Sequence, residues 1–154
     1  MKQLGTLGET VRRYTIVDLS GTLRARQQAR LAGFGDTVRW VDALPEAIQG
    51  VVVGNEVLDA MPVKLLVRQG GQAGGVWWER GVALEGDALA WADRPTELRP
   101  PVEVEGPQDY LSEIHPQAEA FIATLADRFR ASLQSGGRGG AAFFLDYGFP
   151  ESEY

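Results

Sequence analysis

Four apolar runs, each followed at once by an acidic or amide side chain, constrain the fold of this chain more than any other feature. The runs are short and rich in β-branched residues, and they end before Asp18, Asp42, Asn55 and Asp146. Such runs are typical of parallel strands that are covered on both faces. The carboxyl ends of parallel strands meet at one edge of an open α/β sheet, where ligands bind. The pattern therefore predicts an α/β fold with a polar, ligand-binding edge.

Two helical patterns accompany these strands. The first runs from Thr22 to Leu31, and Ser20 is its expected N-cap. The second runs from about Pro116 to Leu133, and we interpret His115 as a residue of the helix start rather than a catalyst. Apolar residues recur along the second helix with a period of 3.6, and we expect this stripe to face the core: Ile114, Ala118, Phe121, Ile122, Leu125, Phe129 and Leu133.

The middle of the chain has a different character. Short strand-like runs are separated by glycine pairs, and a proline-rich connector follows at 94–108. The runs predict antiparallel hairpins inserted into the α/β frame: Val63–Val67, Val76–Glu79, Val82–Leu84 and Ala88–Ala92. We therefore expect a single partial domain over 1–154. Its parts are an α/β half at 14–60, a β-rich insertion and connector at 61–110, and a long helix with a core strand at 111–154.

The composition argues against several classes of function. The 154 residues carry a formal net charge of −6, which disfavours binding to nucleic acid through a general basic field. Cysteine is absent and His115 is the single histidine, so we expect no disulfide, no metal site and no Ser-His-Asp triad. Since no apolar run reaches the roughly 18 residues that span a bilayer, we expect no membrane insertion and a cytoplasmic protein.

The side chains after the strands are the candidate functional residues. An acid in the position of Asp18 can accept hydrogen bonds from both hydroxyls of a ribose, although a solvated acid at a strand end has the same pattern. The segment Gly54–Pro62 places Asn55, Glu56 and Asp59 ahead of a proline. On one helical turn Glu56 and Asp59 would share a face and could grip a cation or a guanidinium. Acids that complement the dipole of a helix start are the alternative.

Three sequence elements together resemble one enzyme family. They are Tyr14-Thr-Ile-Val-Asp-Leu-Ser20, Gly54-Asn-Glu-Val-Leu-Asp-Ala-Met-Pro-Val63 and Leu145-Asp-Tyr-Gly148. They resemble the S-adenosylmethionine (SAM)-dependent methyltransferases that include the bacterial MidA-like proteins and the mitochondrial complex I assembly-factor arginine methyltransferase. The resemblance covers nearly the whole chain from about Tyr14. It implies an α/β fold: a partial class I (Rossmann-like) methyltransferase sheet with an inserted antiparallel β-hairpin region.

The resemblance also implies SAM as cofactor and roles for particular residues. Asp18 and Leu19 match the ribose-binding place after the family's second strand. Adenine would lie near the segment after the third strand, which here is Asp42, Ala43 and Leu44. Asn55 and Glu56 match the place nearest the methyl group. A guanidinium acceptor must lose a proton, and Glu56 or Asp59 could hold it and polarise the attacking nitrogen.

The chain departs from the family pattern in one respect, since no glycine-rich turn precedes Tyr14. In the family, the strand before that turn lies between the second and fourth strands. We therefore expect a part of a longer enzyme with two unpaired inner edges, which alone binds SAM weakly or not at all.

The resemblance implies a protein substrate, which for the mitochondrial member is a subunit of respiratory complex I. The chain could also form a homodimer. A non-catalytic protein-interaction or assembly module and a nicotinamide-dependent enzyme are the alternatives.

Overall fold

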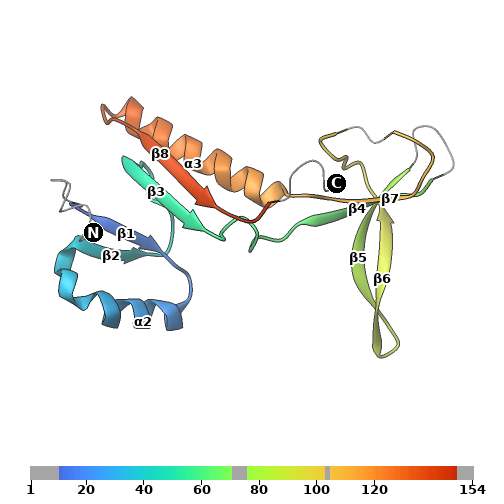
Figure 1. Ribbon diagram of the computed structural model, residues 1–154, viewed down its shortest axis with the longest axis horizontal. Helices are drawn as coiled ribbons and strands as arrows, with labels where there is room; N and C mark the ends of the chain where they lie inside the picture. The colour runs from blue at the N-terminus through green and yellow to red at the C-terminus, as the bar shows by residue number, and fades with distance from the viewer. Residues whose placement is uncertain (1–10, 71–75, 103–104, 149–154) are drawn as a thin grey trace. The chain divides into compact units, whose positions relative to one another are not determined.

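The computed structural model describes residues 11–70, 76–102 and 105–148, which fall into two compact units, Met1–Glu46 and Ala47–Tyr154. In the first unit, strand β1 (Tyr14–Val17) pairs in parallel with β2 (Val38–Val41). Helix α2 (Gly21–Leu31) and the 3-10 segment η1 (Ala32–Thr37) connect them (Figure 1). The boundary between the units falls inside the 14–60 segment.

Helix α2 begins where the sequence predicts. Ser20 Oγ accepts the Leu23 N–H at 3.3 Å, so Ser20 is the N-cap. Gly35, with φ +51°, interrupts η1 in a conformation that suits glycine. None of the α2 side chains is buried, so this helix is held mainly by polar contacts at the ends of β1 and β2, which form part of the site described below.

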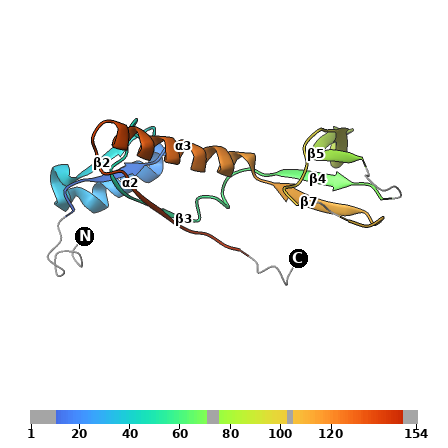
Figure 2. The same ribbon diagram turned by 90° about the horizontal axis from the view of Figure 1, so that it is seen from above.

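The second unit contains the other parallel pair. Strand β3 (Gly50–Asn55) pairs with β8 (Gly140–Leu145), and helix α3 (Pro116–Gln134) lies along them (Figures 1 and 2). Phe144 of β8 packs edge-on against Phe121 of α3, with ring centroids 5.9 Å apart. A Cβ on Gly54 would lie 2.6 Å from Phe144 Cδ1, so glycine at this position makes room for the ring. These contacts join α3 to the two strands.

The expectation that the whole apolar stripe of α3 is core was wrong. Leu125 is buried, but Ile122 and Leu133 are largely exposed. Two strands are too narrow to cover a stripe of this width. On the same two strands Val53 and Phe143 are exposed as well, so one face of the β3–β8 pair has no cover within the described residues.

The inserted region forms an antiparallel sheet of four strands in the order β6-β5-β4-β7. Leu66, Val67 and Trp77 are its buried apolar residues. The buried Arg68 donates through Nη2 to the carbonyls of Gly106 and Gln108, which closes the connector onto the sheet. The strands are β4 (Lys64–Arg68), β5 (Trp77–Glu85), β6 (Ala88–Pro95) and β7 (Tyr110–Ile114).

Two strands differ from the prediction. One continuous strand, β5, replaces the separate runs Val76–Glu79 and Val82–Leu84 and begins at Trp77. Arg80, which lies between the two runs, forms an ion pair across the ladder with Asp93 and so fits within a strand. Strand β7 was not predicted; its five residues pair with β4 along their full length. The adjacent tryptophans behave as alternation requires, since Trp77 is buried and Trp78 is half-buried on the opposite face.

Within the described ranges, β1 and β2 form a two-stranded sheet in the first unit, and β3 and β8 form another in the second unit. Among the described residues, neither α2 nor α3 has the length and apolar character of a membrane-spanning helix.

Candidate functional site

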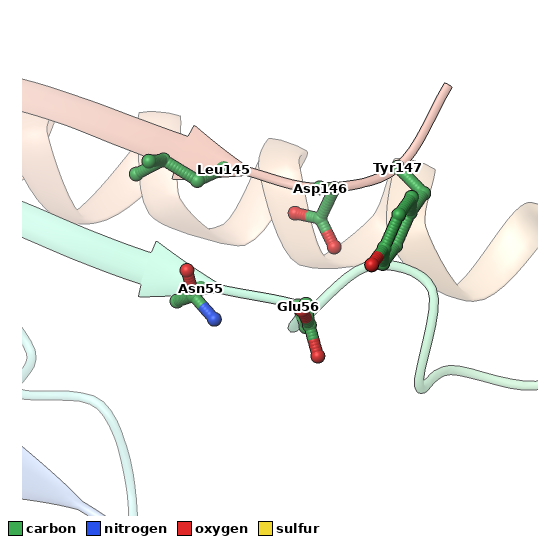
Figure 3. A pocket seen from close by; sticks show the side chains of 5 residues that line it. All are labelled: Asn55, Glu56, Leu145, Asp146 and Tyr147. Atoms are coloured by element: carbon green, nitrogen blue, oxygen red, sulfur yellow. The ribbon is translucent and has the colours of Figure 1, made fainter. Parts of the chain in front are cut away.

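The carboxyl ends of β3 and β8 form a pocket in the second unit. The two strands run in parallel and in register, so Asn55 lies beside Leu145 and the residues that follow them meet. Figure 3 shows the side chains that surround this pocket of about 210 Å³: Asn55, Glu56, Leu145, Asp146 and Tyr147. Asn55, Glu56 and Asp146 are polar residues that the sequence analysis placed after predicted strands. The fold brings them together from two segments that lie about ninety positions apart in the sequence.

Glu56 has an unusual backbone conformation. Its φ is +51°, and it is the only non-glycine residue with positive φ among those described. The left-handed region costs a residue with a Cβ about 1–2 kcal/mol. Here the Glu56 N–H donates to the Leu145 carbonyl at 2.8 Å, which continues the parallel ladder one residue past β3. The chain turns sharply after this bond and leaves the Glu56 side chain exposed at the pocket.

Asp146 holds the turn that follows Glu56. Its Oδ1 accepts the backbone N–H groups of Leu58 and Asp59, at 3.0 and 3.2 Å. Its Oδ2 is buried and has no hydrogen-bond partner within the described residues. Sequence reasoning placed Asp146 after a strand but did not foresee this role, because the bonds join positions 87 and 88 residues apart.

His115 holds the same peptide segment from the other side. Its Nδ1 accepts the Ala118 N–H at 3.1 Å, which makes it the N-cap of α3 as expected. The ring proton therefore belongs on Nε2, which lies 2.9 Å from the Leu58 carbonyl and donates to it. Leu58 is thus bonded through its N–H to Asp146 and through its C=O to His115.

The helical turn that the sequence analysis considers for Glu56 and Asp59 does not form. Residues 56–60 form bends and a turn, closed by the Met61 N–H on the Leu58 carbonyl at 3.1 Å. Glu56 and Asp59 therefore do not share a helical face, and Asp59 does not line the pocket. The physical reason is the pair of long-range bonds at Leu58, which fix a turn that local sequence does not specify.

In the first unit, Asp18 lies in a network of hydrogen bonds at the end of β1. Its Oδ1 accepts the Ser20 N–H at 2.9 Å and its Oδ2 accepts Gln27 Nε2 at 2.7 Å. The Gln27 side-chain oxygen in turn accepts the Trp40 indole N–H at 2.8 Å. The network fixes the carboxylate between β1, α2 and β2.

Arg24 joins the ends of β1 and β2. Its Nη2 donates to the Asp18 carbonyl at 2.8 Å and to the Val41 carbonyl at 3.3 Å, and it is ion-paired with Asp42. The Asp42 side chain is otherwise exposed. The apolar Leu19 is exposed next to Asp18. These contacts place Asp18 and Asp42 at the same edge of the β1–β2 pair, as parallel strand ends require.

The remaining residues named for the cofactor have fewer contacts. Ala43 is exposed and Leu44 is half-buried in the segment after β2. The site residues form two groups, one in each unit. Asp18, Leu19, Asp42, Ala43 and Leu44 belong to the first unit, and Asn55, Glu56, Asp59 and Asp146 to the second.

Known proteins similar to this chain point to one family. Residues 3–154 match the family described as "Putative S-adenosyl-L-methionine-dependent methyltransferase". A candidate methyl transferase of Burkholderia thailandensis, crystallised with S-adenosyl-homocysteine bound, is 42% identical over 99% of this chain and 39% of its own, with a TM-score of 0.72. A native crystal structure of an uncharacterized protein of the same superfamily and organism is 43% identical over 99% of this chain and 40% of its own, also with a TM-score of 0.72.

No curated protein is significantly similar to the chain. The chain spans about two fifths of the length of the two crystallised relatives. The match to the family covers nearly all of the 154 residues, and the strand-end acids on which the resemblance depended lie inside it. The chain belongs to the family of SAM-dependent methyltransferases.

Proposed function

We propose that this chain provides the ribose-binding side and the acceptor-binding side of a SAM-dependent methyltransferase that modifies an arginine side chain of a protein. One observation carries the proposal. At the ends of β3 and β8, Glu56 is held in a strained conformation beside Asp146 in one pocket. Strain of this kind is concentrated at functional sites, where the surrounding structure maintains it.

The residues of the first unit fit a nucleoside. A carboxylate has about four lone-pair sites, and the Asp18 carboxylate uses two of them, for Ser20 and Gln27. Two sites remain for the hydroxyls of a ribose. The exposed Leu19 and the segment from Asp42 to Leu44 offer apolar surface beside this acid for an adenine ring. A relative that matches 99% of this chain was crystallised with S-adenosyl-homocysteine bound, which supports SAM as the ligand.

The residues of the second unit fit a cationic acceptor. When bound, SAM supplies a methyl group activated by a sulfonium, so the protein mainly has to orient the acceptor. A guanidinium nitrogen becomes a nucleophile only as it gives up a proton. In our proposal the exposed Glu56 carboxylate accepts hydrogen bonds from the guanidinium, orients it and receives that proton, while Asn55 holds the adjacent part of the cofactor. Asp59 lies outside the pocket lining and is the weaker candidate.

The choice of arginine as acceptor rests on the resemblance of the Asn55-Glu56 segment to the mitochondrial enzyme, and on the suitability of a carboxylate for a guanidinium. A subunit of respiratory complex I is therefore the first protein to test.

A non-catalytic interaction module is the second candidate function. It is favoured by the exposed apolar side chains of the β5–β6 hairpin, such as Trp91 and Leu89.

The test compares two conservative variants, Glu56→Gln and Asp59→Asn, in a protein of the length of the relatives. Transfer of a labelled methyl group from SAM to arginine-containing peptides is measured, together with SAM affinity by calorimetry. We expect Glu56→Gln to abolish transfer and to leave SAM affinity within a few fold, whereas Asp59→Asn keeps most of the transfer. Wild-type turnover in Glu56→Gln would remove Glu56 from the mechanism.

A further inference from the structure

The β5–β6 hairpin extends beyond the rest of its sheet. Strand β4 pairs only with residues Trp77–Arg80 of β5. From Gly81 to Ala92 the two strands of the hairpin pair only with each other, and Gly86 with φ +63° forms the turn. Figure 1 shows β5 and β6 as a ribbon that continues past β4. A two-stranded ribbon in water is marginally stable at best, so a face that contacts another surface gains stability.

One face of this ribbon is apolar and exposed. Val82 lies opposite Trp91 and Leu84 lies opposite Leu89, and directly opposed residues point to the same face. These side chains are exposed to 60%, 63%, 68% and 78%, respectively. We call them the hairpin patch. The other face carries small residues at the same level of the ribbon, namely Gly81, Ala83, Ala90 and Ala92.

The size of the hairpin patch suits an interface between two similar surfaces. Contiguous apolar patches of a few hundred Å² mark interaction sites on soluble proteins, and four large side chains with most of their surface exposed reach that size. If two such patches pack face to face, with the ribbon backbone around them, they remove on the order of 1,000 Å² from water, which is the lower limit for a specific interface.

The charges along the hairpin differ between its two ends. The tip carries two carboxylates, Glu85 and Asp87. On the face of the hairpin patch, the base carries the neutral ion pair of Arg80 with Asp93, whereas Glu79 with Lys64 and Arg94 lies on the opposite face. The patch face is therefore neutral at its base, and the acidic tip is the charged end of the arm.

We infer that a second copy of this chain covers the hairpin patch, with the two hairpins packed face to face and antiparallel. In this arrangement Val82–Trp91 of one copy lies over Leu84–Leu89 of the other, and the two acidic tips lie at opposite ends of the interface. The two contacts are related by a two-fold axis, as in most homodimers. A parallel arrangement would bring the acidic tips together in a chain whose net charge is already −6.

Self-association of the chain tests the patch. Sedimentation equilibrium across the micromolar range should show a monomer–dimer equilibrium, and Leu89→Lys should weaken it by about tenfold or more, because the lysine enters an apolar contact in both copies. The matched control is Leu111→Lys, which adds the same charge at a leucine 57% exposed on β7 of the same sheet. Circular dichroism verifies that both variants fold.

The tip charges test the orientation. The double variant Glu85→Gln, Asp87→Asn should leave the dissociation constant of the dimer within about twofold if the two tips lie at opposite ends of the interface. If the tips face one another, the same variant strengthens the dimer, and the antiparallel arrangement is wrong. A chain that stays monomeric throughout, or a dimer that Leu89→Lys and Leu111→Lys weaken equally, overturns the inference. The second result would assign dimerisation to another surface, such as the open edges of β1 and β3.

Discussion

Removal of the Asp146 carboxylate should loosen the turn that carries Glu56, and the size of the effect follows from two hydrogen bonds. Asp146 Oδ1 accepts the partly buried Leu58 N–H at 3.0 Å and the exposed Asp59 N–H at 3.2 Å. A bond to a charged group contributes about 1.5–3 kcal/mol, and the longer, exposed bond contributes less. We expect Asp146→Ala to lower the free energy of unfolding by about 2–3 kcal/mol in total. For a chain of this size the melting temperature should fall by about 5–10 °C.

A second substitution separates the hydrogen bonds from the charge. In Asp146→Asn the amide oxygen can still accept hydrogen bonds from both N–H groups, but a neutral acceptor forms weaker bonds. The free energy of unfolding should therefore fall by about 1 kcal/mol. Glu113→Ala is the control, since it removes an exposed carboxylate of β7 for which the structure records no side-chain hydrogen bond within the described residues. It should leave the stability within about 0.5 kcal/mol of the original chain.

The assay combines urea unfolding with amide chemical shifts. The Leu58 and Asp59 amide protons should move upfield in Asp146→Ala and stay near their original positions in Asp146→Asn. If Asp146→Ala leaves both shifts unchanged, the turn is held by something other than this carboxylate. An alanine variant as stable as the original chain would refute the energetic estimate as well.

Three further results are expected. Phe121→Ala should destabilise the chain by less than the about 3–5 kcal/mol of a fully buried phenylalanine, because the ring is only half-buried; an unchanged melting curve would contradict its contact with Phe144. Gly54→Ala should cost about 1–3 kcal/mol in urea unfolding, because its Cβ would meet the Phe144 ring at 2.6 Å, and a neutral effect would show that the ring moves aside freely. The hydrogen bond from Arg94 lowers the pKa of Glu79 from its ordinary value of 4.5, so the free energy of unfolding should fall as the pH drops below 4.5. Glu79→Gln should reduce this dependence on acid, and equal dependence in the variant and the original chain would refute the pairing of Glu79 with Arg94.

The sequence predicts best those elements whose pattern is local. The strand at 50–55, the strand at 140–145 and the helix from Pro116 each carry their own apolar run or period, and the structure confirms them. Strand β7 was missed because its five residues follow a proline-rich connector and show only a short alternation. It exists because β4 offers a complete edge for pairing.

The geometry of the candidate site was less predictable from the sequence than the secondary structure was. Strand ends alone placed Asp18, Asn55 and Glu56 correctly at sheet edges. The conformation of Glu56 was not predictable, since it depends on a ladder bond to Leu145 and on the hold of Asp146 on the next turn. Those partners lie about ninety residues away, and no local propensity encodes them.

The ends of the antiparallel sheet lie next to each other, because Lys64 at the start of β4 pairs with Ile114 at the end of β7. The chain thus leaves the parallel core and returns to it at nearly one point, directly beside the Leu58–His115 hydrogen bond. A segment whose two ends are neighbours can be lengthened, shortened or exchanged for a tight turn with little loss of chain entropy elsewhere. The β4–β7 region can therefore change in length or sequence as a unit without displacing the acids at the strand ends.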